Sequence, residues 1–162
     1  MPKSGDGRAT QRQEQEEDLI EMITSTVTSY IRDEQCLLLL ACSADQDVEN
    51  SLTMSLVKRN NAEDRCIGVF TKVDLVIDTR VQTVQDILKG HRYLFGRGWY
   101  VTKLRSQQES DAGVSFDDAK ERERELFATA LWAGTPSLTE RHGMSNLQDE
   151  IAGSLHNHIV SE

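Results

Sequence analysis

The sequence predicts an α/β fold: a partial parallel sheet flanked by helices, with a trailing helical segment. Three short apolar runs have the length and composition of buried strands. Between them lie stretches whose apolar residues recur at spacings of three and four, the period of an amphipathic helix. This alternation of helix and strand is typical of doubly wound sheets with helical crossovers. We expect the strands at residues 36–42, 66–70 and 99–103.

A helix is expected before each of these strands. Residues 1–13 are polar and lack periodicity, so we interpret them as a flexible leader; a helical pattern begins at Glu14. The run at residues 36–42 shows no alternation, which indicates a strand buried on both faces. The expected helices span residues 14–31, 48–56, 81–88, 115–131 and 145–160.

Beyond residue 113 the pattern changes to two predicted helices joined by a loop. Ser115 and Asp118 have the spacing of a capping box at a helix start. A loop is expected around Pro136, before a final amphipathic helix. The predicted organisation is therefore a leader at 1–13, an α/β part at 14–113 and a helical end at 114–162.

The charged stretch at residues 118–125 could be mistaken for a binding patch. Asp118 and Arg122 lie on neighbouring helical turns, as do Glu121 and Arg124. Opposite charges at these spacings compensate one another, so the stretch is interpreted as a solvated helix face.

Composition and charge exclude several classes of function. The net charge of −9 argues against a nucleic-acid surface, which needs a basic field. The sequence shows no bilayer-length apolar run and no secretory signal, so a cytoplasmic location is expected. The cysteines lack CxxC spacing and the histidines are scattered, so we expect buried free thiols and no metal site. The cysteines are Cys36, Cys42 and Cys66.

A polar cluster follows the second predicted strand, where ligands of open α/β sheets bind. It reads Thr71-Lys-Val-Asp74 and fits the Asn/Thr-Lys-x-Asp motif of GTPases. The Asp74 carboxylate can accept from the ring N–H and the exocyclic amino group of guanine, a contact that adenine cannot make. The Lys72 stem can lie against the purine, and Thr71 is expected to hold the loop. Because four-residue matches also arise by chance, a purely structural use of the cluster is the alternative.

Four ordered segments match the pattern of one protein family. Residues 36–50 form an apolar strand and a turn rich in small, Asn and Asp residues, and residues 65–75 read RCIGVFTKVDL, close to RTIGVxTKxDL. Residues 99–107 end in LRSQ, where the family often has NRSQ, and residues 141–159 follow RxGTxxLQ and LxxHI. On these segments the chain resembles the dynamin superfamily of GTPases, including dynamin-like and Mx-like proteins, from about residue 18 onwards.

The resemblance implies which residues would contact a guanine nucleotide. It implies GTP or GDP as the ligand, a partial P-loop-GTPase-like sheet, and a helical end that leads from the GTPase domain towards a stalk. Leu104 stands where many dynamins have Asn, so a hydrogen bond to the base or ribose is expected to be missing. The expected site residues are Thr71, Lys72, Asp74, Arg105, Ser106 and Gln107.

Catalysis is not expected from this sequence. It holds no GxxxxGK run followed by Ser or Thr, the loop that cradles phosphates and holds Mg2+ in the intact family. The switch Thr and the DxPG motif also lack counterparts. No catalytic or metal-binding residue is therefore assigned. Membrane or cytoskeletal contact is expected only through parts of the family that this sequence does not contain.

Three interpretations follow from the resemblance. The chain is part of a dynamin-like GTP-binding protein, or a short pseudo-GTPase that binds partners through a sheet edge or its last helix, or a truncated gene product. In the family's sheet the strand at 36–42 would pair with the phosphate-loop strand. We therefore expect residues 36–42 to have an open edge, which favours self-association.

Overall fold

The computed structural model describes residues 6–76 and 78–160 of the 162-residue chain. The chain divides into two units, residues 1–36 and 37–162. The helices are α1 (Asp6–Arg32), α2 (Leu52–Arg59), α3 (Asp78–Leu88), α4 (Gln107–Asp111), α5 (Phe116–Ala128), α6 (Ala130–Ala133) and α7 (Met144–Val160). The strands are β1 (Leu38–Ser43), β2 (Cys66–Thr71) and β3 (Trp99–Val101). Short 3-10 turns are η1 (Val48–Asn50), η2 (Glu63–Arg65), η3 (Val73–Leu75) and η4 (Pro136–Arg141).

The first unit consists mainly of α1, which is longer than predicted. It begins at Asp6, so residues 6–13 are helical where a flexible leader is expected, and residues 1–5 lie outside the described range. These residues include Arg, Ala and Gln, which have high helix propensity and continue a helix without an apolar stripe. Periodicity of apolar residues therefore underestimates the length of a helix whose first turns are polar all round.

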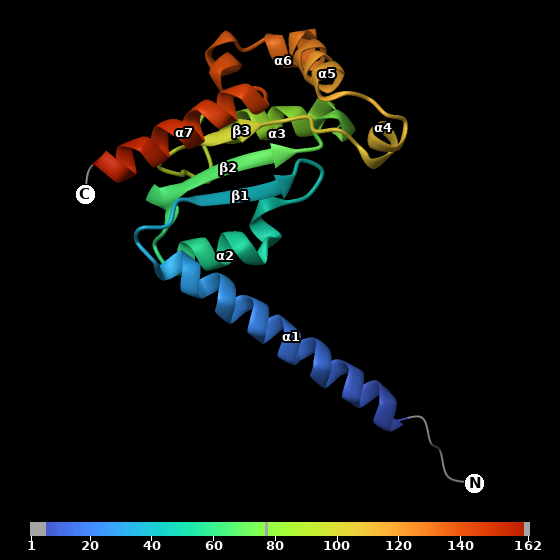
Figure 1. Cartoon of the computed structure of the whole chain (residues 1–162), viewed down its shortest axis with the longest axis vertical. Coiled ribbons are helices and arrows are strands. Elements are labelled where there is room, and N and C mark those ends of the chain that lie inside the picture. The colour runs from blue at the N-terminus through green and yellow to red at the C-terminus, as the bar shows by residue number, and fades with distance from the viewer. Residues whose placement is uncertain (1–5, 77, 161–162) are drawn as a thin grey trace. The chain divides into compact units, whose positions relative to one another are not determined.

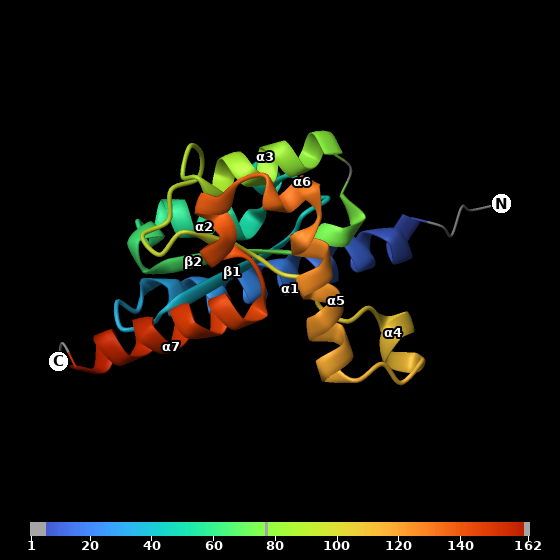
Figure 2. The same cartoon turned by 90° about the horizontal axis from the view of Figure 1, so that it is seen from above.

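The sheet of the second unit has three parallel strands, as predicted, and their order is β1-β2-β3. Leu39 pairs in register with Ile67, and Phe70 with Val101. Crossovers between parallel strands are right-handed, so two successive steps in one direction place both crossover helices on the same face. Helices α2 and α3 accordingly cover one face and α7 covers the other (Figures 1 and 2).

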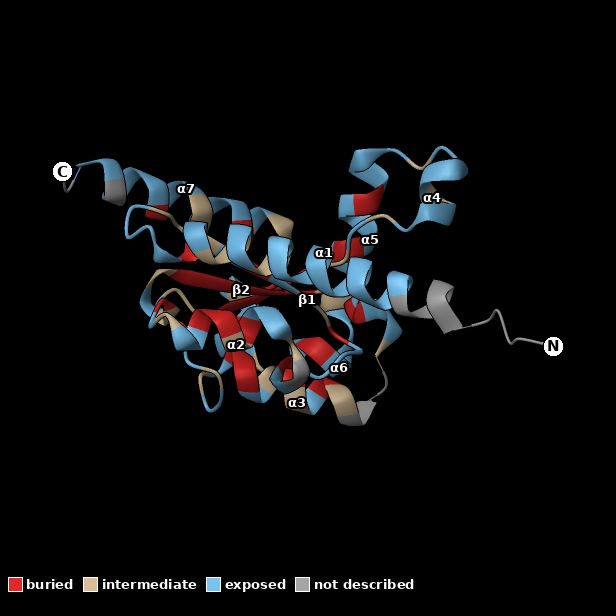
Figure 3. Cartoon of the chain, turned by 90° about the horizontal axis from the view of Figure 1, so that it is seen from below, coloured by how far each residue is buried: buried red, intermediate tan, exposed pale blue. Residues whose placement is uncertain are grey.

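The core is built around β2, whose first five residues are buried (Figure 3). Position 68 must be glycine, because a Cβ there would lie 2.2 Å from the ring of Trp99 on β3. The Trp99 ring stacks on Phe70 and Phe95, with centroids 4.8 and 4.9 Å apart, and its indole N–H donates to the carbonyl of Tyr93 at 2.7 Å. These aromatic rings fix β3 against β2.

The prediction that the first strand is buried on both faces is wrong. Within β1 only Leu40 is buried, and Leu39 is 52% exposed. Leu147 of α7 packs into a cluster with Ile67 and Val69 of β2, and Leu39 lies on the same face beside Ile67. The cover over this face therefore reaches the central strand but leaves β1 partly open.

The free side of β3 is partly closed by the chain segment before α7. Val101 forms an isolated parallel bridge with His142, and the backbone N–H of Gly143 donates to the carbonyl of Val101 at 2.8 Å. Gly143 has a φ of 88°, a left-handed conformation that glycine adopts at little cost. The segment just before α7, at His142 and Gly143, therefore extends the sheet beyond β3 by a short bridge.

The helix expected at residues 115–131 is interrupted. Thr129 has extended backbone, with a ψ of 152°, and its hydroxyl donates to the carbonyl of Leu126 at 2.7 Å, so α5 and α6 are separate helices. The predicted start is confirmed, since the Ser115 Oγ accepts from the backbone N–H of Asp118 at 3.1 Å. The final helix, α7, is also confirmed.

Candidate functional site

The loop after β2 places the first predicted cluster at the carboxyl end of the central strand. The Thr71 hydroxyl donates to the carbonyl of Cys42 on β1 at 3.3 Å, as expected of a residue that holds the loop. Lys72 has a φ of 56° and turns the chain into η3, where Val73 is buried and Asp74 is exposed. The buried Val73 anchors the loop, and the Asp74 carboxylate faces solvent.

A second carboxylate lies near Lys72, on the loop after β1. The Ser43 hydroxyl donates to Asp45 and lowers the pKa of that carboxyl, and the charges of Lys72 and Arg80 lower it further. Arg80 also donates from Nε to the carbonyl of Ala44 at 2.9 Å. Asp45 and Arg80 are absent from the predicted site. Ser43 ends β1 and Asp45 follows it, and this position at the carboxyl end of a strand is the signal that could have found Asp45.

The loop after β3 uses its predicted site residues to build α4. Arg105 donates from Nη1 to the carbonyl of Val114 at 2.6 Å, and its guanidinium carbon lies 4.1 Å from the ring centroid of Phe116. Ser106 caps α4, and the Gln107 amide donates to Asp111 at 2.8 Å. These three side chains are therefore held by contacts within the loop and its neighbouring turns.

The sheet brings the two predicted loops to one edge. Strands β2 and β3 are adjacent and parallel, and the backbone N–H of Thr102 donates to the carbonyl of Phe70 at 2.8 Å just before both loops begin. Leu104, in place of the family's Asn, is 50% exposed. Asp74 and the loop after β3 thus lie at the same carboxyl edge of the sheet.

An ionic cluster that the sequence analysis missed fixes the β3 loop. Glu109 accepts from the backbone N–H of Ser106 at 2.9 Å, from Arg122 Nη1 at 2.8 Å and from Lys103 Nζ at 3.2 Å. These contacts, of which the Ser106 N–H has the largest effect and Lys103 the smallest, lower the pKa of Glu109 to about 2. The sequence Ser106-Gln-Gln-Glu109 has the spacing of a capping box and could have predicted the role of Glu109. The structure forms this capping box.

The charged face of α5 is solvated only in part. The predicted pair of Glu121 and Arg124 is confirmed, whereas Arg122 pairs with Glu109 instead of Asp118. The interpretation is wrong for Glu123, which is only 7% exposed. Its Oε1 accepts from the backbone N–H of Lys103 at 2.8 Å, and its Oε2 accepts from that of Met144 at 3.0 Å.

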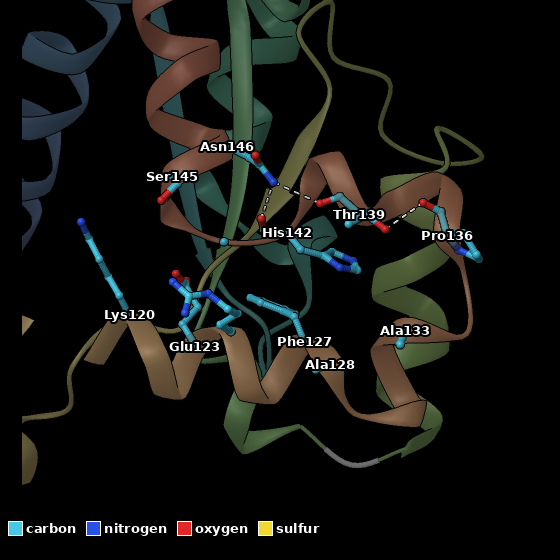
Figure 4. A pocket seen from close by; sticks show the side chains of 12 residues that line it. Lys120, Glu123, Phe127, Ala128, Ala133, Pro136, Thr139, His142, Ser145 and Asn146 are labelled. Atoms are coloured by element: carbon cyan, nitrogen blue, oxygen red, sulfur yellow. Dashed lines mark hydrogen bonds between the residues drawn. The ribbon is translucent and has the colours of Figure 1, made fainter. Parts of the chain in front are cut away.

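A pocket of about 440 Å3 lies beside Glu123, between α5, α6, η4 and the start of α7 (Figure 4). His142 lines it and is 9% exposed, with its ring stacked on Phe127 at a centroid distance of 4.9 Å. Burial lowers the pKa of His142 below its ordinary value. None of the predicted site residues lines this pocket.

The three cysteines of the chain all lie in the described ranges, 6–76 and 78–160. In these ranges the cysteines form no disulfide; Cys66 is buried, which raises its pKa to about 12, and Cys36 and Cys42 are half-buried. No group of three or more His, Cys, Asp or Glu residues in these ranges could hold a metal ion. In the same ranges, no helix is both long and apolar enough to cross a membrane.

The comparisons with known proteins agree on one family. Residues 83–162 match the family model described as the dynamin central region. The soybean (Glycine max) dynamin-related protein 12A is 32% identical over 152 residues, which cover 91% of this chain and 24% of that protein. Dynamin of Drosophila melanogaster is 30% identical over 146 residues, which cover 88% of this chain and 16% of that protein.

The interferon-induced GTP-binding protein Mx2 of the dog (Canis lupus familiaris) is also similar, at 28% identity over 137 residues. That match covers 78% of this chain and 19% of the dog protein. Together the matches support a place for the chain in the dynamin superfamily, as a dynamin-like protein that spans about a quarter or less of the length of these relatives. The predicted boundary between a GTPase-domain part at 14–113 and a helical end at 114–162 stays a prediction, since the family match runs across it.

Proposed function

We propose that this chain supplies the base-recognition side of a guanine-nucleotide site in a dynamin-like GTP-binding protein. One observation carries the proposal. The exposed carboxylate of Asp74 stands on a short loop at the carboxyl end of the central strand, and Thr71 and the buried Val73 fix that loop to the sheet. A rigid carboxylate in this place suits a ligand that offers two adjacent N–H donors.

Guanine offers those donors on its Watson–Crick edge, and adenine does not. A bidentate contact to Asp74 would therefore distinguish the two bases, and the Lys72 stem would cover one face of the ring. Arg105, Ser106 and Gln107 would contribute by shaping the neighbouring loop, because their side chains already hold α4 and its surroundings. The names of the Mx relatives, which call them GTP-binding proteins, support the same ligand.

The residues of this chain would contact the base and not the phosphates. The sequence has no phosphate-cradling loop, and the described ranges 6–76 and 78–160 have no acidic cluster that fits Mg2+. No hydrolytic step is therefore assigned to the residues of this chain. With base contacts alone, we expect dissociation constants of about a millimolar to high micromolar for GDP.

The test exchanges the hydrogen-bonding pattern of the site. In Asp74→Asn, the amide presents one donor and one acceptor, which matches xanthine and mismatches guanine. We expect the wild-type chain to prefer GDP over ADP and Asp74→Asn to prefer xanthosine diphosphate by about tenfold, measured by NMR titration. A gained affinity cannot arise from misfolding.

Asp86→Asn is the matched control, since Asp86 is an exposed carboxylate on α3. It should leave the preference for GDP unchanged. Equal binding of GDP and ADP by the wild-type chain would contradict the assignment of Asp74 as a guanine selector.

A second candidate function is self-association through β1, with a second copy of the chain as the partner. In the part of the chain that the structure describes, β1 is an outer strand paired on one side by β2, with Leu39 52% exposed beside that edge. Unpaired strand edges next to apolar side chains favour pairing with another chain. We expect Leu39→Lys to weaken dimer formation in sedimentation velocity, and Leu94→Lys, at a loop residue that is 71% exposed, to leave it unchanged. A wild-type chain that stays monomeric at high concentration would rule this function out.

A further inference from the structure

The pocket beside Glu123 is separate from the sheet edge that carries Asp74. Its walls are partly apolar, with Phe127 and Ala128 from α5, Ala133 from α6 and Pro136 from η4. Its volume of about 440 Å3 falls in the range of small-molecule sites. The pocket is therefore large enough for a ligand of two fused rings.

A buried polar atom of His142, a residue that lines this pocket, has no hydrogen-bond partner. Nε2 of His142 is buried and lacks a hydrogen bond, while the ring is held between Phe127 and Trp132 at centroid distances of 4.9 and 5.8 Å. The imidazole extends into the space between Phe127 and η4 (Figure 4). A buried polar atom left unpaired costs about 1–3 kcal/mol, so a ligand atom that bonds to Nε2 recovers free energy.

The charges around the pocket favour an anion. Lys120 and Arg124 lie one turn apart on α5 and both line the pocket, where Glu123 is the neighbouring carboxylate and Arg124 also pairs with the exposed Glu121. Glu123 already accepts hydrogen bonds from two backbone N–H groups, which stabilise its negative charge. The N-terminus of α7 also faces this region through Ser145 and Asn146, and helix N-termini stabilise negative charge.

These features have an order in space. Figure 4 shows Lys120 at one end of the pocket and His142 towards the other, with Phe127 between them. A ligand that satisfies all three has an anionic group at one end, a flat apolar body in the middle and a hydrogen-bonding atom at the far end. Aromatic side chains such as Phe127 pack well against flat rings.

We propose that this pocket binds an aromatic carboxylate with a hydroxyl group at the opposite end of its ring system. The carboxylate pairs with Lys120 and Arg124, the rings lie against Phe127, and the hydroxyl bonds to His142 Nε2. This site is independent of the guanine site, because it shares none of the six residues predicted for that ligand.

The test titrates the full chain with 6-hydroxy-2-naphthoate and follows both indole N–H signals by NMR. Trp132 packs edge-on against His142 and should shift, whereas Trp99, in the sheet core, should not. We expect 2-naphthoate, which lacks the hydroxyl, to bind about tenfold more weakly, and the neutral 6-hydroxy-2-naphthylmethanol to bind more weakly still. Titrations of the wild-type chain without a change at Trp132 would overturn the proposal.

Two variants separate the polar contacts. His142→Phe keeps a ring against Phe127 and should abolish the advantage of the hydroxyl group, so that both naphthoates bind equally. Lys120→Gln should weaken both naphthoates about fivefold and leave the neutral alcohol unchanged. Lys89→Gln, an exposed lysine of the second unit outside the pocket, is the control. If His142→Phe retains the hydroxyl preference, or if the alcohol binds as tightly as the acid, the proposed ligand class is wrong.

Discussion

Strands β1 and β2 are neighbours of the same length and apolar character, but their surroundings differ. Both have six residues, both are mainly apolar, and they pair in parallel along their whole length. Five residues of β2 are buried, whereas Leu40 alone is buried in β1. The hydrophobicity of a strand therefore indicates that it belongs to a sheet, but its place in the sheet decides how much of it is covered.

The third strand shows that an outer position does not by itself expose a strand. All three residues of β3 are buried, although β3 also pairs with only one named strand. Its free side meets the bridge from Val101 to His142, and Tyr100 is covered by the cluster that includes Leu147. Local cover explains the difference between the two outer strands.

The largest expected effect comes from truncating the two residues that face each other across β1 and β2. Ile67 is fully buried and Leu39 is 52% exposed, yet they lie in register on the same face. Ile67→Ala should reduce the free energy of unfolding by about 2–5 kcal/mol, because it leaves a cavity under α7. Leu39→Ala should cost about 1 kcal/mol or less, because half of its side chain is already in water.

Urea unfolding at low protein concentration measures both variants, with an unchanged denaturant slope as the sign that the folded states are comparable. Equal losses would break the comparison, since they would mean that Leu39 is covered as well as Ile67 in solution. A difference above about 2 kcal/mol would confirm that coverage by α7 distinguishes the strands.

The fold was largely predictable because its signals are local. Apolar runs gave the three strands, and spacings of three and four gave the final helix. The uncovered face of β1 could not be predicted from its own residues, because Leu39 depends on where a helix more than 100 residues later crosses the sheet. The early start of α1 was missed because its first turns have no apolar side.

For the candidate sites too, the sequence predicts local features but not contacts between distant segments. Asp74 and Thr71 could be placed from a motif that follows a strand, and both lie where expected at its carboxyl end. The contacts of Arg105 with Val114 and Phe116 were not predictable, because they form between loop positions without a fixed pattern. The role of Glu123 was hidden within a run of charges, since sequence does not show which of several acids turns inward.

The smallest expected effect concerns the ion pair between Glu109 and Lys103, which lies just after the buried outer strand β3. The pKa of Glu109 falls from an ordinary 4.5 to about 2 in the folded chain, so its contribution to stability is complete above pH 4.5. That contribution is lost as the pH falls towards about 2. Glu109→Gln should therefore lower the melting temperature near neutral pH and flatten its fall between pH 4.5 and about 2.

Glu125→Gln is the control, since it removes the same charge from an exposed position on α5 outside the Glu109 cluster. Melting curves of the three chains over this pH range give the comparison. Identical acid profiles for Glu109→Gln and the wild-type chain would show that the cluster does not stabilise the fold.

The buried carboxylate of Glu123 also has a consequence for the order in which the chain assembles. It accepts one amide 20 residues before it and another 21 residues after it. Neither amide can be protected by this acceptor until α5 has docked, so we expect the segment after β3 and the first turn of α7 to become ordered together. We therefore expect the amides of Lys103 and Met144 to become exposed to hydrogen exchange in the same opening event, although 41 positions separate them in the chain.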